Sequence, residues 1–339
     1  MIKRFIATLA LASLLPAPAF AWGYTGHTYI SRVAAEHFPA ELPAFVRSKA
    51  AVDMVATLGP EEDRIKGAGQ SWDDDNDPGH FLDVDDNLSV YGVVKLTALP
   101  PSMEAYVRAL EAAHTDPYKA GFVPYSIMDG WERVRKDFAI WRVDDYLASH
   151  ALTDAAKARF AADRALRETL TLRDIGVWSH FVADGSQPLH ITIHFNGWGP
   201  GPDPKGYSTS HHIHSMFESE FVSAHVTMGD VVKHLSPFTP ANPHALLSQT
   251  DIASIVGGYL SASALAVGPL YDIEKAGGFA AATPAAVDFA ATQLGRGATM
   301  LRDLVALAWE DSANESVGYP PIAVRDVLSG KVVPPNDGQ

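Results

Sequence analysis

Apolar residues recur along this chain at three- and four-residue steps, the spacing that gathers them on one face of a helix. The clearest run comprises Trp131, Val134, Phe138 and Trp141. Similar spacing covers five more stretches, which are residues 27–38, 102–114, 154–170, 246–267 and 284–309. Alternating apolar and polar positions, which indicate strands, are few and short. The pattern therefore predicts an all-α protein.

Several predicted helices begin at residues that can cap a helix N-terminus. Ser102 precedes one of them, and Thr283 is followed by Pro284, a residue suited to the first helical position. Thr171 has Asp174 three residues later, which predicts that a helix begins at Thr171 and that the segment from residue 180 lies at its end.

The first 21 residues are typical of an export signal. Lys3 and Arg4 precede an apolar stretch over residues 5–15, and Ala-Phe-Ala at residues 19–21 suits signal peptidase. A membrane anchor is the alternative, but the stretch is short for a bilayer and is followed by two prolines. Cleavage would leave Trp22 as the N-terminus of a periplasmic or secreted protein. No later segment is expected to span a membrane.

Composition narrows the chemistry of the remaining 318 residues. We find no interdomain linker and no repeat, so we expect residues 22–339 to form one domain, with a disordered tail over residues 332–339. The chain has no cysteine, so any metal must be held by histidine, carboxylate or backbone groups. Its net charge of -14 becomes -16 without the signal, which disfavours a nonspecific DNA-binding module. No stable protein partner is predicted.

The densest polar stretch is HFVADGSQPLH, residues 180–190. His180 and Asp184 are four residues apart and share one helix face, so they can grip one cation, with His190 just beyond the helix end. His214 and Glu218 repeat this spacing. With 14 histidines and 40 acids, about two such pairs are expected by chance and four occur, so the spacing alone is a weak signal.

Other candidate ligands follow in a consistent order. The mature chain opens with WGYTGH, ending at His27; Asp63 and His80 come next. Together, WGYTGH, HFVADGSQPLH and the later HSMFE resemble the single-strand-specific zinc nucleases of fungi, plants and bacteria, which share a tri-zinc helical fold with bacterial zinc-dependent phospholipase C. These motifs extend from Trp22 to Glu218. Beyond Glu218 only the helical pattern guides the prediction.

The resemblance implies three zinc ions per chain. Asp63 and Asp184 would also hold the reacting water between two bridged ions, which gives them a catalytic role. At Asp63 and His80 the matched segments are short, and Glu62 or Asp83 could compete with them. The implied ligand sets are Asp63, His80, His180 and Asp184 for one ion; Asp184, His27 and the amine and carbonyl of Trp22 for the second; and His190, His214 and Glu218 for the third.

The implied activity is zinc-dependent hydrolysis of phosphoesters. The first reading is a secreted endonuclease and 3'-nucleotidase acting on single-stranded DNA or RNA, with Tyr24, Phe81 and Trp198 as candidates for a base pocket. The second is a zinc-dependent phospholipase C acting on phospholipid head groups. The third is a secreted zinc-binding protein without catalysis.

Three departures from the nuclease pattern bear on the substrate. Glu218 stands where nucleases usually carry Asp and the phospholipases carry Glu, although the WGYTGH opening is nuclease-like. Gly79 replaces the aromatic residue that usually precedes the ligand histidine. The span from His80 to His180 exceeds the family norm, which suggests an insertion within residues 85–165.

Overall fold

The computed structural model describes residues 22–66, 71–199, 202–203, 205–238 and 251–332. The predicted signal segment and all but the first residue of the predicted tail lie outside these residues. The protein is 68% helical and 3% strand, which confirms the all-α class.

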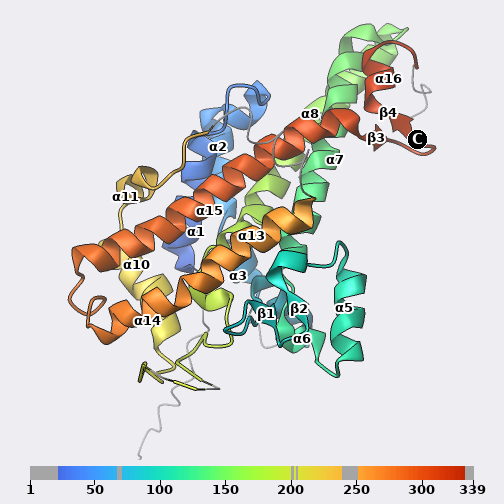
Figure 1. Ribbon diagram of the computed structural model, residues 1–339. Helices are drawn as coiled ribbons and strands as arrows, with labels where there is room; N and C mark the ends of the chain where they lie inside the picture. Colours follow the sequence, from blue (N-terminus) through green and yellow to red (C-terminus); the bar gives the residue numbers. More distant parts are fainter. Residues whose placement is uncertain (1–21, 67–70, 200–201, 204, 239–250, 333–339) are drawn as a thin grey trace, which may run out of the picture.

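Five helices form the frame of the fold: α1 (Gly23–Glu36), α2 (Lys49–Leu58), α7 (Val123–His150), α8 (Asp154–Asp184) and α15 (Pro284–Asp311). The two long helices α7 and α8 pack along each other, and α1 packs between α15 and α2 and also contacts α8 (Figure 1). The far end of α7 and α8 projects from the rest of the frame (Figure 1).

Shorter elements complete the chain. They are the helices α3 (Glu61–Ile65), α4 (Asp73–Asn76), α5 (Met103–Ala112), α6 (Pro117–Ala120), α9 (Ile213–Ser215), α10 (Val222–His225), α11 (Met228–Lys233), α13 (Ile252–Leu265), α14 (Val267–Lys275) and α16 (Val324–Leu328), the 3-10 turns Ala44–Arg47, Asp77–His80, Leu96–Ala98, Pro188–His190 and Ser312–Asn314, and the π-helix Met216–Phe221. Two antiparallel hairpins pair β1 (Ser89–Val90) with β2 (Val94–Lys95) and β3 (Ser316–Val317) with β4 (Ile322–Ala323).

The structure confirms two of the predicted caps and corrects the third. The hydroxyls of Ser102 and Thr283 accept hydrogen bonds from backbone N–H groups in the first turns of α5 and α15. Thr171, in contrast, lies buried inside α8, which begins seventeen residues earlier at Asp154 under a cap from Thr153. Its hydroxyl donates to the carbonyl of Arg167 one turn back, which satisfies the group without ending the helix.

Two apolar cores hold the molecule together. The larger contains buried apolar residues of α1, α2, α7, α8, α13 and α15. The smaller lies towards the projecting end, where Val143, Leu147 and Phe160 of α7 and α8 pack with Val324 and Val327 of α16. The C-terminal half of α8 therefore runs through the main core, and it carries the segment in which candidate ligands are densest.

One later segment, Ile252–Lys275, is long and apolar enough by composition to cross a membrane. The expectation that no segment of this length and apolarity follows the signal is therefore wrong. The helices α13 and α14 follow one another with a single residue between them, so together they form one long apolar segment. Core packing accounts for part of this apolarity, since α13 packs on α7 and its Tyr259 and Leu260 are buried.

A cavity of about 420 Å³ at the projecting end, between α7, α8 and the β3–β4 hairpin, generates a prediction about stability. It is lined by Asp144, whose pKa burial raises to about 7, and by the exposed Asp163. Because an unfolded Asp titrates near pH 4, the folded protein binds this proton more tightly, and stability is lost as the pH rises from about 4 to 7. We expect Asp144→Asn to exceed the wild type in unfolding free energy by up to about 4 kcal/mol at pH 8 and to match it near pH 4.

Urea unfolding at both pH values measures the effect. Asp163→Asn is a companion variant: because the charge of Asp163 also raises the pKa of Asp144, this variant should give a smaller gain in stability with the same pH dependence. A difference between Asp144→Asn and wild type that stays constant across the pH range contradicts the prediction.

Candidate metal centre

The eight side chains predicted as metal ligands meet in one buried region. They form three groups in which the potential ligand atoms lie within 4.8 Å of one another and could hold metal ions. The groups are His27, His180 and Asp184; Asp63, His80 and His180; and His190, His214 and Glu218.

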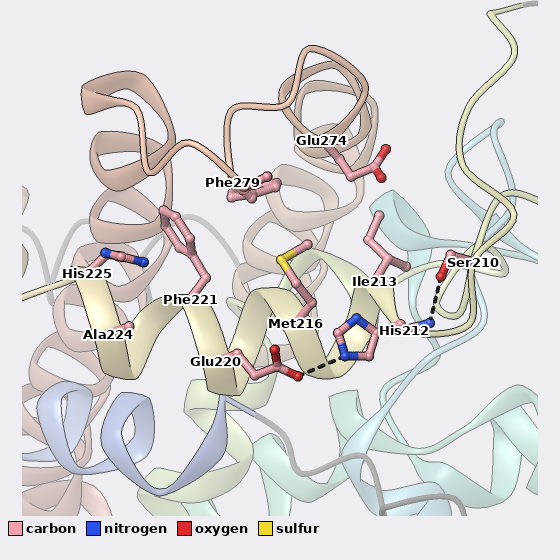
Figure 2. A pocket seen from close by; sticks show the side chains of 11 residues that line it. Ser210, His212, Ile213, Met216, Glu220, Phe221, Ala224, His225, Glu274 and Phe279 are labelled. Carbon is pink, nitrogen blue, oxygen red and sulfur yellow. Dashed lines mark hydrogen bonds and ion pairs between the residues drawn. The ribbon is translucent and has the colours of Figure 1, made fainter.

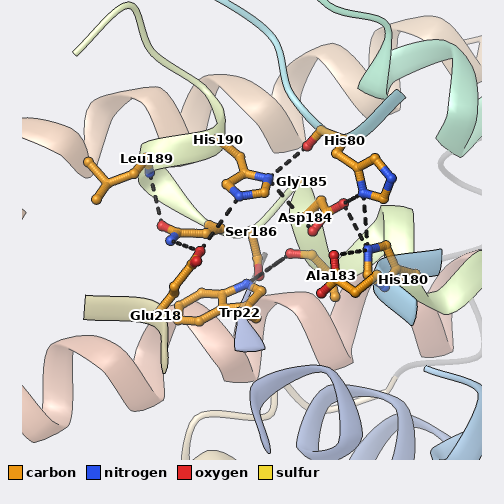
Figure 3. A network of polar contacts seen from close by, with 12 residues as sticks. Trp22, His80, His180, Ala183, Asp184, Gly185, Ser186, Leu189, His190 and Glu218 are labelled. Atoms are coloured by element: carbon orange, nitrogen blue, oxygen red, sulfur yellow. Dashed lines mark hydrogen bonds and ion pairs between the residues drawn. The ribbon is translucent and has the colours of Figure 1, made fainter. Parts of the chain in front are cut away.

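Asp184 lies at the middle of this region (Figure 3). Its Oδ1 is 3.5 Å from His27 Nε2 and 3.7 Å from His190 Nδ1. Its Oδ2 is 3.0 Å from His80 Nδ1 and 3.4 Å from His180 Nε2. One carboxylate therefore touches four imidazoles and joins the three groups into a single cluster.

Separate elements deliver the ligands to this cluster. The last turn of α8 presents His180 and Asp184 on one face, as their four-residue spacing predicted. His214 belongs to α9, whereas Glu218 lies in the π-helix that continues it. Such π-helical turns are rare and occur frequently at functional sites. The remaining ligands come from α1 (His27), α3 (Asp63) and the 3-10 turns that end at His80 and His190.

Backbone carbonyls fix the orientation of two imidazoles. His180 Nδ1 lies 2.9 Å from the carbonyl oxygen of Gly59, and His190 Nδ1 lies 2.7 Å from that of His80. Because a carbonyl oxygen only accepts, each Nδ1 carries the proton and each Nε2 is left unprotonated. This is the arrangement in which a histidine binds a metal through Nε2.

Burial changes the pKa values of the histidines and acids in the cluster. It lowers the pKa of His27, His80 and His180 well below the ordinary value, so these rings are neutral and able to donate to a metal. Burial also raises the pKa of Asp184 well above its usual range and that of Asp63 to about 6. For both acids, the effect of burial outweighs the nearby positive charge of Lys66 that would favour the carboxylate form.

Glu218 has a different environment from the two aspartates. Burial works to raise its pKa, but the neighbouring rings of His214 and His190 outweigh that effect and lower the pKa to about 2. His214 Nε2 lies 3.0 Å from Glu218 Oε2, and His190 Nε2 lies 3.7 Å from it. Glu218 is thus ionised at neutral pH and can hold a cation with these two histidines.

Lys66 is a charged residue of this region that the sequence analysis missed. Its ammonium lies 2.8 Å from Asp63 Oδ1. Burial works to lower the pKa of Lys66, but Asp63 and Asp184 outweigh it and raise the pKa, so the lysine is charged. Its position three residues after Asp63 on the same helical turn could have indicated it. One ammonium offsets only part of the charge of three buried carboxylates.

The residues present fit zinc. Buried donor atoms lack a hydrogen-bond partner among the described residues at both nitrogens of His27 and His214, at Asp63 Oδ2, at Asp184 Oδ1 and at Glu218 Oε1. Buried polar atoms without partners are costly, and a metal ion is one way to satisfy them. Nitrogen and carboxylate donors in groups of three are also the usual ligands of catalytic zinc.

Trp22 is anchored beside the cluster by its side chain. The buried indole N–H donates to the carbonyl of Ala183 and to the hydroxyl of Ser186, each at 2.9 Å, and the ring packs against Phe217. These contacts hold the start of α1 against the end of α8, where Asp184 lies (Figure 3). Whether the amine and carbonyl of Trp22 bind metal stays a prediction.

Other histidines near His214 face elsewhere. His212 pairs with Glu220 at 2.9 Å, and both line a cavity of about 450 Å³ with Met216, Phe221 and Glu274 (Figure 2). None of these five residues belongs to the three metal-holding groups found in the described part of the chain. Only one face of this helical segment therefore serves the candidate metal centre.

Comparison with known proteins does not assign this chain to a family, so its function has to be inferred from the chemistry of the site. No family model, no curated protein and no solved structure matches this chain significantly.

The central place of Asp184 generates a prediction about metal content. We expect Asp184→Asn to lose at least two of the ions that the wild type binds, because the Asp184 carboxylate touches four candidate histidine ligands. Glu218→Gln should lose one, because the candidate histidine ligands that Glu218 contacts are His190 and His214. Metal analysis after equilibrium dialysis against buffered Zn²⁺ measures both.

Glu220→Gln is the control, since it removes a carboxylate from the opposite face of the same segment. Equal losses from Asp184→Asn and Glu218→Gln, or a loss from Glu220→Gln, would show that the three groups do not act as described.

Proposed function

We propose that this protein is a zinc-dependent phosphodiesterase that binds three zinc ions and acts on single-stranded DNA or RNA as an endonuclease and 3'-nucleotidase. The observation that carries the proposal is the cluster in which the Asp184 carboxylate lies against histidines of all three groups of buried nitrogen and oxygen donors. Clustered metal sites that share carboxylates are typical of enzymes that hydrolyse phosphoesters.

Bound zinc would supply Lewis acidity, a water molecule activated at neutral pH and positive charge to offset a phosphate. The chain itself would hold the reactants. Asp63 and Asp184 would help to hold cations and would orient the attacking water, while His190, His214 and Glu218 would hold a further cation whose charge offsets that of the phosphate. The buried Lys66 ammonium adds positive charge on the Asp63 side.

Substrate choice would depend on the surroundings of the cluster. Of the aromatic residues suggested for a base pocket, Tyr24 is 66% exposed and so is accessible to a splayed base. Trp198 stacks on His194 at 3.9 Å between ring centres, which leaves one face of its ring engaged within the protein. Phe81 follows the ligand His80 directly. Tyr24 and Phe81 are therefore the better candidates.

A substrate comparison tests the proposed activity. We expect the zinc-loaded mature protein to release nucleotides from single-stranded RNA and not to release head groups from phosphatidylcholine micelles. Cleavage of the lipid and not of the RNA would replace the proposed nuclease with a phospholipase C. Glu218 favours that outcome, because the phospholipases carry Glu at this position. Metal binding without hydrolysis of either substrate would reduce the protein to a zinc-binding role.

The N-terminus generates a second prediction. We propose that the chain is exported and cut between Ala21 and Trp22, as its signal pattern predicts. The amine of Trp22 exists as a free group only after that cleavage. Protein that begins at Trp22 should bind three ions, and protein with a four-residue extension should bind fewer and lose at least tenfold in turnover. Full activity of the extended form would refute the involvement of the amine. The matched control is a chain that begins at Trp22 and carries the same four residues at its C-terminus instead.

A further inference from the structure

The amide of Gln187 connects two segments that carry candidate ligands. Its Nε2 donates to Glu218 Oε2 at 3.2 Å, and its Oε1 accepts from the backbone N–H of Leu189 at 2.9 Å. The side chain is fully buried, and these two bonds satisfy both ends of the amide. The Leu189 contact fixes the amide, and the amide then fixes the carboxylate.

The backbone of Gln187 belongs to the same construction. Its N–H donates to the carbonyl of Asp184 and its carbonyl accepts from the N–H of His190, each at 3.0 Å. Gln187 is thus bonded through its main chain to two candidate ligands and through its side chain to a third. The backbone bonds set the turn between Asp184 and His190, whereas the side chain alone reaches the π-helix.

The chemistry of the amide suits this position. Glu218 Oε2 receives the Gln187 N–H and faces His214 Nε2, while Glu218 Oε1 has no hydrogen-bond partner among the described residues. A glutamate at position 187 would place a second carboxylate against Glu218, and an apolar residue would leave Oε2 without its donor. A neutral side chain with one donor and one acceptor meets both requirements.

We propose that Gln187 is a positioning residue for the metal ion held by His190, His214 and Glu218, and that it acts by fixing the Glu218 carboxylate with Oε1 left free. The inference rests on the proposed function for the presence of that ion. Residues that orient a metal ligand typically change metal affinity by 10- to 100-fold when they are replaced.

The test is a zinc titration of the full mature chain. In Gln187→Met we expect the dissociation constant of one ion to rise about 10- to 100-fold while the other two ions remain bound as in the wild type. Gln187→Asn keeps the amide but is one methylene short, so it should weaken the same ion. Gln293→Met is the control, because Gln293 is also buried but bonds to Arg296 in α15. Zinc content at a series of buffered free zinc concentrations, with thermal unfolding of the metal-free proteins, gives the constants.

The double variant separates positioning from general packing. If Gln187 acts through Glu218, Gln187→Met should cause no further loss of zinc in a Glu218→Gln background. An unchanged third constant in Gln187→Met, or equal weakening of all three ions, overturns the inference. A wild type that binds no third ion overturns it together with the proposed metal centre. A wild type that binds three ions but cuts neither RNA nor lipid overturns the proposed activity and leaves the role of Gln187 intact.

Discussion

The burial of the Asp184 carboxylate is the constraint on which the site depends. It lies among four imidazoles that burial keeps neutral, so the protein supplies it with little positive charge from histidine. An uncompensated buried charge costs several kcal/mol, whereas a whole domain is stable by only about 5–15 kcal/mol. Lys66 offsets one charge near Asp63. Cations held by the three groups would remove the remaining penalty, which makes metal binding and folding stability two aspects of the same energy balance.

The packing of the helices holds this arrangement in place. The Gly59 carbonyl at the end of α2 orients His180. Gly59 also packs closely on Ser31 of α1, so a Cβ at position 59 would lie 2.3 Å from the Ser31 hydroxyl oxygen. That hydroxyl is 2.7 Å from the hydroxyl of Ser179, on the turn of α8 that carries His180. Polar contacts of this kind join α1, α2 and α8 directly behind the ligands, so the ligand geometry is supported by the main core.

The length of α8 places the site and a second core on one rigid element. Its C-terminal half carries His180 and Asp184 into the main core, while Phe160 in its N-terminal half packs with α16 in the smaller core. The projecting pair α7 and α8 includes part of the stretch for which an insertion was expected, and Asp144, with its raised pKa, lies in that part. The helix α8 thus contributes both to the candidate metal centre and to the projecting end.

The sequence alone determined the helical class, the starts of α5 and α15, and the eight side chains that meet in the candidate metal centre, because helical periodicity, capping and the ligand motifs are local properties of the chain. A new helix was predicted wrongly to begin at Thr171, where α8 continues unbroken from Asp154, since a buried hydroxyl can bond the carbonyl one turn back instead of capping a helix. The role of Gln187 became visible only in the tertiary structure, because its side chain bonds Glu218 in a distant segment. The pairing of Lys66 with Asp63 is local, but only the tertiary structure shows that Asp184 also acts on Lys66, since no local spacing records which side chains meet when helices pack.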